Sequence, residues 1–219
     1  MNELLFSFHI FLVLGFAWGA LKLGREALIS WIALQAILAN LFVIKQIELF
    51  GLGVTCSDVY AIGSMLGLNL LQEYFGKESA TRATWISFFL MIFFAIMSGA
   101  HLLYLPSARD TSHPSFLAVL SQTPRLLLAS LCTFFVVQRV DVHLFHLFQK
   151  LLPHSSLALR TGITLTLSQL LDTALFSFLG LYGIVSSVGT LLLFSFLIKL
   201  LIIFALLPAL LFFKRRAHV

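Results

Sequence analysis

The sequence predicts an all-α protein, a single multi-pass transmembrane bundle of about seven helices. Composition is the first reason: of the 219 residues, 60% are hydrophobic and only 11% are charged. An average soluble domain is about 45–50% apolar and about 25% charged, so nine acids and fourteen bases are too few to cover a soluble protein of this size. The second reason is a mean hydropathy of +1.02. The third is that the apolar residues gather in long runs.

These runs are long enough to cross a bilayer. A transmembrane helix needs about 20 mostly apolar residues, because each residue adds about 1.5 Å and the hydrocarbon core is about 30 Å thick. The first run carries Glu3, lacks the positive region of a signal peptide and is too long for one, so we expect a retained helix. Pro124 and Arg125 interrupt the start of the fifth run. In order, the expected helices are 4–21, 27–45, 54–72, 84–104, 119–139, 161–182 and 189–213.

The connections between these helices are too short to form a separate soluble domain, so we expect residues 1–219 to make one transmembrane domain. The longest connection, VDVHLFHLFQKLLPHSSLALR, precedes the sixth helix, and the others are a few to about a dozen residues long. No internal repeat is evident. Cys56 and Cys132 form no disulfide framework and are interpreted as buried small hydrophobic residues.

The distribution of basic residues predicts the orientation of the bundle. Basic residues gather in the short loops on the cytoplasmic side of a membrane protein, and this also explains the pI near 9.5 without a nucleic-acid partner. We therefore expect the N-terminus outside, the C-terminus in the cytoplasm and an odd number of spans. The expected cytoplasmic set is Lys22, Arg25, Lys77, Arg82, Arg139, Lys150, Arg160, Lys214, Arg215 and Arg216, and the opposite set is Lys45, Arg109 and Arg125.

Polar residues interrupt three of the helices in an ordered way. In the sixth, Thr161, Thr164, Ser168 and Asp172 recur on one helical face, with Gln169 beside them. The third helix has a comparable face, and Lys199 lies near the middle of the seventh. The members of the face on the third helix are Asp58, Met65, Asn69 and Gln72, followed by Glu73.

Charges near the centre of a transmembrane helix are costly, about 2.5–3.5 kcal/mol each for Asp or Lys on insertion scales. Asp172 and Lys199 have opposite signs, so their cost falls if they face each other or a wet cavity. Two interpretations follow for this pair. Either it belongs to a pathway for a polar solute, or it only specifies how the last two helices pack.

The sequence offers little support for an enzyme, a metal or a cofactor. No phosphate-binding P-loop, no Ser/His/Asp arrangement and no H-E-x-x-H motif occurs. His143 and His146 form a pair at helical spacing, but no third ligand is evident, so we interpret them as interfacial histidines. We therefore expect no catalytic residue, no metal and no cofactor.

Five short motifs in order resemble the queuosine precursor transporter family, also called the VUT family. They are ILANLFVIKQIELFG (37–51), LLQEYFGKESATRA (70–83), RLLLAS with QRVDVHLF (125–130 and 138–145), SQLLDT (168–173) and the region of Lys199. The resemblance covers roughly residues 27–213. Where many relatives carry an acid, four residues before Glu73, this chain carries Asn69.

The resemblance implies a multi-pass protein of the bacterial inner membrane that imports 7-deazaguanine bases, namely queuine, preQ0 or preQ1. Its partners would be this small-molecule substrate and the lipid bilayer, with no nucleic acid. Carried over by motif, the residues of interest are Asn40, Lys45, Glu73, Arg125, Ser130, Gln138, Asp141, Asp172 and Lys199. The expected substrate-binding set consists of these residues except Lys45, together with Gln169 and Asn69.

The chemistry of such a base suits these side chains. A 7-deazaguanine presents N1–H and a 2-amino group on one edge, and a carboxylate accepts both hydrogen bonds side by side. We expect Asp172 to bind this donor edge, with Gln169 or Gln138 adding amide contacts. Lys199 would either meet the carbonyl oxygen of the base or hold Asp172 while the site is empty. A second hypothesis is proton coupling through Asp172 or Glu73.

Two other functions stay open. The chain could be a vitamin-binding subunit that docks on a separate ATPase through a face of Gly15, Gly19 and Ala20, or it could be a structural membrane protein whose buried charges only fix helix packing. The G-x-x-x-G spacing of Gly15 and Gly19 also leaves a homodimer open.

Overall fold

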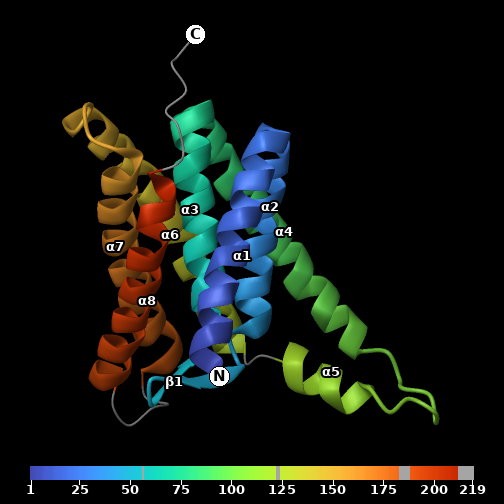
Figure 1. Cartoon of the computed structure of the whole chain (residues 1–219). Helices are drawn as coiled ribbons and strands as arrows, with labels where there is room; N and C mark the ends of the chain where they lie inside the picture. The colour runs from blue at the N-terminus through green and yellow to red at the C-terminus, as the bar shows by residue number, and fades with distance from the viewer. Residues whose placement is uncertain (56, 122–123, 183–187, 212–219) are drawn as a thin grey trace.

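The protein is a bundle of seven long helices, with a β-hairpin and one short helix at its lower end (Figure 1). The computed structural model describes residues 1–55, 57–121, 124–182 and 188–211. The helical multi-pass fold predicted from the sequence is confirmed. The elements are α1 (Asn2–Leu23), α2 (Arg25–Phe42), β1 (Gln46–Leu49), β2 (Leu52–Thr55), α3 (Asp58–Phe75), α4 (Lys77–Leu102), α5 (His113–Leu120), α6 (Pro124–Leu151), α7 (Leu157–Phe176), the π-helix η1 (Ser177–Leu181) and α8 (Val188–Leu210).

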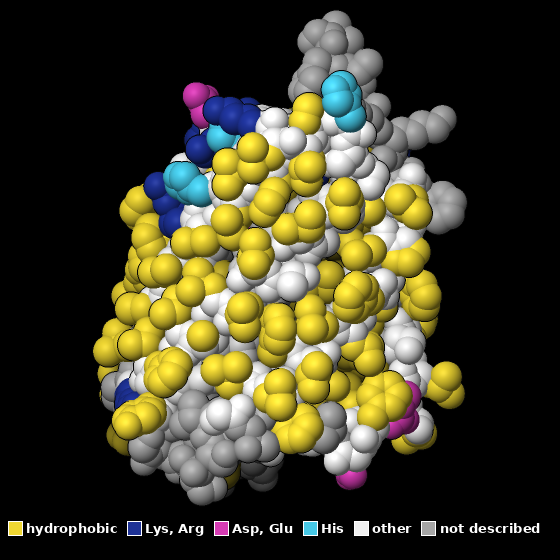
Figure 2. Space-filling view, turned by 90° about the vertical axis from the view of Figure 1, so that its left-hand side faces the viewer, with side chains coloured by type: hydrophobic (Ala, Val, Ile, Leu, Met, Phe, Trp, Pro, Cys, Tyr) yellow, Lys and Arg dark blue, Asp and Glu magenta, His cyan; other side chains and the backbone are white. Residues whose placement is uncertain are grey.

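Six of these helices are long and apolar enough to cross a membrane: α1, α2, α4, α6, α7 extended by η1, and α8. On the face drawn in Figure 2, hydrophobic side chains cover the middle of the molecule and charged side chains gather at its two ends. This banding suits a hydrocarbon layer between two polar layers. Figure 1 shows α1 beginning at the lower end and α8 ending at the upper end. Which end faces the cytoplasm stays a prediction.

The remaining long helix, α3, is the centre of the bundle. It packs against α1, α2, α4, α6, α7 and α8, and thirteen of its eighteen residues are buried. Because protein surrounds it, α3 can carry Asp58, Asn69, Gln72 and Glu73 without exposing them to lipid. Two glycines of α3 allow this close packing. A Cβ on Gly67 would lie 2.6 Å from Ile32 Cγ1, and one on Gly63 would lie 2.9 Å from Val13 Cγ1.

The lower end contains two elements that the sequence analysis did not predict. The expected loop QIELFGLG forms the antiparallel hairpin β1–β2, whose two turn residues, Phe50 and Gly51, have φ values of 52° and 76°. Positive φ at both central positions is the requirement of a type I′ turn, which suits the twist of a two-residue hairpin. Asn2 Nδ2 donates to Glu48 O at 2.9 Å, so the start of α1 is tied to the hairpin. The other element is α5, in the expected loop before α6.

The connection before α7 is much shorter than expected, because α6 continues to Leu151. The polar residues of this segment lower its mean hydropathy. Val142 and Phe145 between them are nevertheless buried, on the face of α6 that points into the bundle. Arg139 therefore lies within α6, and its guanidinium carbon is 5.9 Å from the ring centre of Trp85. Arg160, expected in the same connection, lies in the first turn of α7 and is 2% exposed.

The two cysteines also differ from the interpretation as buried residues. Cys132 is exposed on α6, on the outward face that also contains Leu128 and Val136, because residues four apart share a helical face. Cys56 lies outside the described residues.

Candidate substrate site

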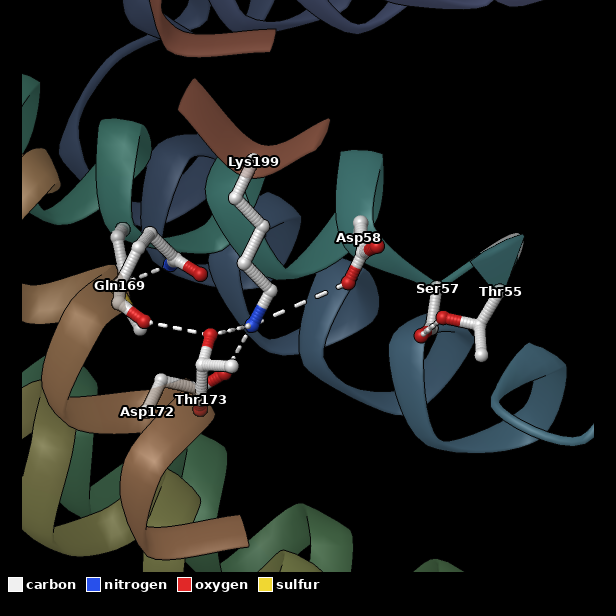
Figure 3. A network of polar contacts seen from close by, with 8 residues as sticks. Thr55, Ser57, Asp58, Gln169, Asp172, Thr173 and Lys199 are labelled. Carbon is white, nitrogen blue, oxygen red and sulfur yellow. Dashed lines mark hydrogen bonds and ion pairs between the residues drawn. The ribbon is translucent and has the colours of Figure 1, made fainter. Parts of the chain in front are cut away.

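Lys199 of α8 joins two acidic side chains from different helices (Figure 3). Its Nζ lies 2.5 Å from Asp172 Oδ2 on α7 and 3.9 Å from Asp58 Oδ1 at the start of α3. The same nitrogen donates to Thr173 Oγ1 at 3.1 Å. The side chain of Lys199 is 6% exposed, and those of Asp58 and Asp172 are 11% and 19% exposed. The two charges singled out in the sequence are thus in contact, inside the bundle.

Gln169 lies one turn from Asp172 on α7, facing α3. Its Nε2 donates to Met65 Sδ at 3.0 Å, while its Oε1 is buried without a partner among the described residues. Its backbone oxygen accepts the hydroxyl of Thr173 at 2.8 Å, which places Thr173 against the ammonium group of Lys199. Gln169 and the charged cluster are therefore parts of one polar region.

A second set of polar side chains joins α3, α6 and α7. Ser168 Oγ donates to Asp141 Oδ1 at 2.7 Å, and Gln138 Nε2 donates to Ser64 Oγ at 2.9 Å. Asp141, Gln138 and Ser168 are fully buried, and Asn69 is 1% exposed with both amide atoms unpaired among the described residues. Buried polar groups without partners are rare in folded proteins, so this set is notable for its unused hydrogen-bonding atoms.

A third set lies towards the other end of α3. Arg160 Nη2 of α7 donates to Glu73 Oε1 at 2.6 Å, and Gln149 Nε2 of α6 donates to Glu73 Oε2 at 3.0 Å. Both oxygens of Glu73 are therefore occupied. The side chains of Arg160 and Glu73 are 3% and 9% exposed. This arrangement ties together the ends of α3, α6 and α7.

The remaining predicted residues lie elsewhere. Ser130 Oγ of α6 donates to Asn40 Oδ1 of α2 at 3.2 Å, so these two form a separate contact. Arg125 is exposed and donates to the backbone oxygens of Leu179 at 2.9 Å and Tyr182 at 2.6 Å. It thereby satisfies carbonyl groups at the end of η1, as basic side chains do at helix C-termini.

The expected substrate-binding set did not include five residues of these polar contacts, namely Asp58, Ser168, Thr173, Gln149 and Arg160. A signal for Arg160 existed, because it lies four residues before Thr164 and continues the polar face that leads to Asp172. The sequence nevertheless predicts a loop there, because the apolar run of the sixth helix begins only at residue 161, whereas α7 begins at Leu157. Asp58 and Gln149 depend on partners from other helices, which sequence spacing does not specify.

Among the hollows on the described surface, two have volumes of about 790 Å³ and 290 Å³. The larger is lined by α4 residues between Lys77 and Leu90, and the smaller by residues near Met1 and the hairpin. Neither is lined by a predicted substrate-binding residue. In this conformation the described polar side chains of α3, α6, α7 and α8 contact one another.

Comparisons with known proteins bear on these residues. The family model described as "Putative vitamin uptake transporter" matches residues 57–213, the part of the chain that contains all three polar sets. A protein of Bacillus subtilis (strain 168) named "Probable queuosine precursor transporter" is 32% identical over 178 residues, which cover 80% of this chain and 76% of that protein. No solved structure matches the chain.

Proposed function

Because the chain belongs to the vitamin uptake transporter (VUT) family, we propose that it imports 7-deazaguanine precursors of queuosine across the bacterial cytoplasmic membrane. The family resemblance read from the motifs is confirmed by these matches. The name of the Bacillus subtilis protein supports the choice of substrate class. A transporter also gives a reason for buried ionisable groups, which in membrane helices commonly line a substrate or ion pathway.

The observation that carries the proposal is the Asp172–Lys199 contact. Asp172 is the most exposed of the three charged side chains in its cluster, at 19%, so it is the carboxylate that a ligand reaches first. A carboxylate that already accepts a charge-assisted hydrogen bond can accept the paired N–H donors of a 7-deazaguanine instead. The 2.5 Å distance supports the proposal that Lys199 holds Asp172 while the site is empty.

The neighbouring amides supply the rest of the site. The Oε1 atoms of Gln169 and Gln138 have no partner among the described residues, so they can accept further ring N–H groups, and the amide of Asn69 can both donate and accept. Once Asp172 turns to the base, Lys199 stays compensated by Asp58, 3.9 Å away, or donates to the carbonyl oxygen of the base. The substrate therefore replaces an internal ion pair without leaving an isolated buried charge.

Complementation tests this proposal. A strain unable to make the base receives the gene and is fed queuine, preQ0 or preQ1 separately, and queuosine in tRNA is measured. We expect at least one precursor to restore queuosine with the native chain and none to do so with Asp172→Asn, at equal amounts of protein in the membrane. Asp110→Asn, at an exposed acid between α4 and α5, is the matched control. Normal uptake by Asp172→Asn would end the assignment of Asp172.

The rival interpretation as a subunit of an ATPase-driven transporter depends on the small residues of α1. Nothing lies within 4 Å of a Cβ built on Gly15 or Gly19, so these positions are open to another helix. Ala20, by contrast, is buried and does not extend that face. Co-purification of an ATPase with the native chain, lost in Gly15→Leu, would favour this interpretation, whereas a second copy of the chain in its place would indicate a homodimer.

A further inference from the structure

Asp141 is a buried acid that forms no ion pair with any cation among the described residues. It lies on α6 and is 0% exposed. Its one hydrogen bond is the Ser168 hydroxyl on Oδ1, and its Oδ2 is buried without a partner in the described part of the chain. Within that part no Lys, Arg or His nitrogen lies within 4.0 Å of it, since every ion pair involves another acid.

The charged groups on the surrounding helices are already engaged. Lys199 of α8 contacts Asp172 and Asp58, and Arg160 of α7 contacts Glu73 of α3. On α4, no titratable side chain occurs between Arg82 and His101. Arg139 is two residues from Asp141 on α6, so it lies on nearly the opposite helical face, with its guanidinium over the Trp85 ring. The negative charge of an ionised Asp141 would therefore be uncompensated.

Hydrogen bonding leads to the same conclusion. Gln138 lies three residues before Asp141 on α6, and Gln169 follows Ser168 on α7. Each has a buried Oε1 that receives no hydrogen bond from the described residues. Asn69 adds an unpaired oxygen as well as an unpaired nitrogen, so acceptors remain in excess. A carboxylate only accepts hydrogen bonds, whereas a carboxylic acid also donates one. One proton on Oδ2 both removes the buried charge and supplies a donor.

We propose that Asp141 is the proton-binding group of this transporter, protonated when α6 and α7 pack as they do here and deprotonated when they separate. Closing this interface over an ionised carboxylate without a cation is strongly unfavourable, so closure selects the protonated form. Opening admits water, and the carboxylic acid returns its proton to that water. Transport by alternating access would then carry a proton with the substrate, a consequence that rests on the proposed function.

This assignment differs from the two acids that sequence reasoning considered for coupling. Asp172 and Glu73 each contact a cation at 2.5–2.6 Å, so a buried partner already compensates the charge of each carboxylate. In the described part of the chain, Asp141 has no such partner.

Infrared spectroscopy of the purified protein in lipid tests, without any substrate, whether Asp141 is protonated. The carbonyl stretch of a carboxylic acid is well separated from the stretching bands of a carboxylate. We expect an acid band in the native protein that is lost in Asp141→Asn and kept in Asp110→Asn. The Ser112 hydroxyl and backbone N–H donate to Asp110 and lower its pKa, so this exposed acid contributes no such band. Ser168→Ala should shift the band, since Ser168 donates to Asp141. A band unaffected by both Asp141→Asn and Ser168→Ala, or no band at all, would overturn the proposal.

Proteoliposomes with a trapped pH indicator test the coupling. With queuine, preQ0 or preQ1 outside, we expect internal acidification to accompany uptake in the native protein, and none in Asp141→Asn. Substrate entry without proton entry, or entry that requires Na⁺ instead, would overturn coupling through Asp141. If no 7-deazaguanine crosses with the native protein, the proposed function itself fails, and the infrared result still decides whether Asp141 holds a proton.

Discussion

Replacing Arg160 by Met should destabilise the bundle, because it leaves the buried carboxylate of Glu73 without a cation. The change removes the guanidinium that lies 2.6 Å from Glu73 while retaining most of the apolar volume of the side chain. Glu73 then keeps the hydrogen bond from Gln149 at 3.0 Å but has no cation. Because the side chains of Arg160 and Glu73 are only 3% and 9% exposed, water cannot readily replace the lost partner.

The expected magnitude follows from this burial. Removing one partner of a buried ion pair costs about 3–5 kcal/mol. For a chain of 219 residues, each kcal/mol lowers the melting temperature by about 2–4 °C, so Arg160→Met should lower it by roughly 6–20 °C. The double variant Glu73→Gln/Arg160→Met should be more stable than Arg160→Met alone, because no ionised acid is left unpaired.

Thermal and denaturant unfolding in one detergent measure both variants against a matched control. Arg25→Met removes the same type of side chain from the ion pair of Arg25 with Glu26. The side chains of Arg25 and Glu26 are 49% and 77% exposed. Screening by solvent makes such a pair weak, so this control should unfold almost as the native protein does. If Arg25→Met and Arg160→Met lose equal stability, or if the double variant is the least stable of all, the reasoning from burial is refuted.

Two further substitutions test the packing and the charged cluster. Gly67→Ala should lower the free energy of unfolding by about 1–3 kcal/mol, since its Cβ would lie 2.6 Å from Ile32. Gly15→Ala, with nothing within 4 Å, should be neutral or slightly stabilising, and equal losses from the two would contradict the packing described for α3. Lys199→Met leaves Asp172 facing Asp58 without a cation, so less folded protein should survive extraction than with Lys199→Arg. Gel filtration measures that yield, and a Met variant that matches the native protein would show that the acids do not depend on Lys199.

Much of the site could be predicted from local sequence. The cost of a charge in hydrocarbon is enough to single out Asp172 and Lys199 and to suggest that they meet, and helical spacing gathers Ser168, Gln169 and Asp172 on neighbouring positions of α7. Hydropathy alone, however, predicts an end of α6 at residue 139, whereas the helix continues to Leu151. Arg139 and Asp141 resemble loop residues as long as their partners are unknown. Hydropathy likewise gave no sign of the β1–β2 hairpin, whose stability depends on strand pairing and a turn with positive φ.

What the sequence determines by itself is the membrane-embedded helical bundle and the presence of charges that need partners, because lipid permits few ways to satisfy a backbone or a buried ion. The tertiary structure decides which partner each charge receives. It pairs Arg160 with Glu73 and brings Asp58 within 3.9 Å of Lys199, and it gives Asp141 no cation partner among the described residues. These outcomes depend on how α3, α6, α7 and α8 are rotated against one another, and helix rotation is set by packing between segments far apart in the chain.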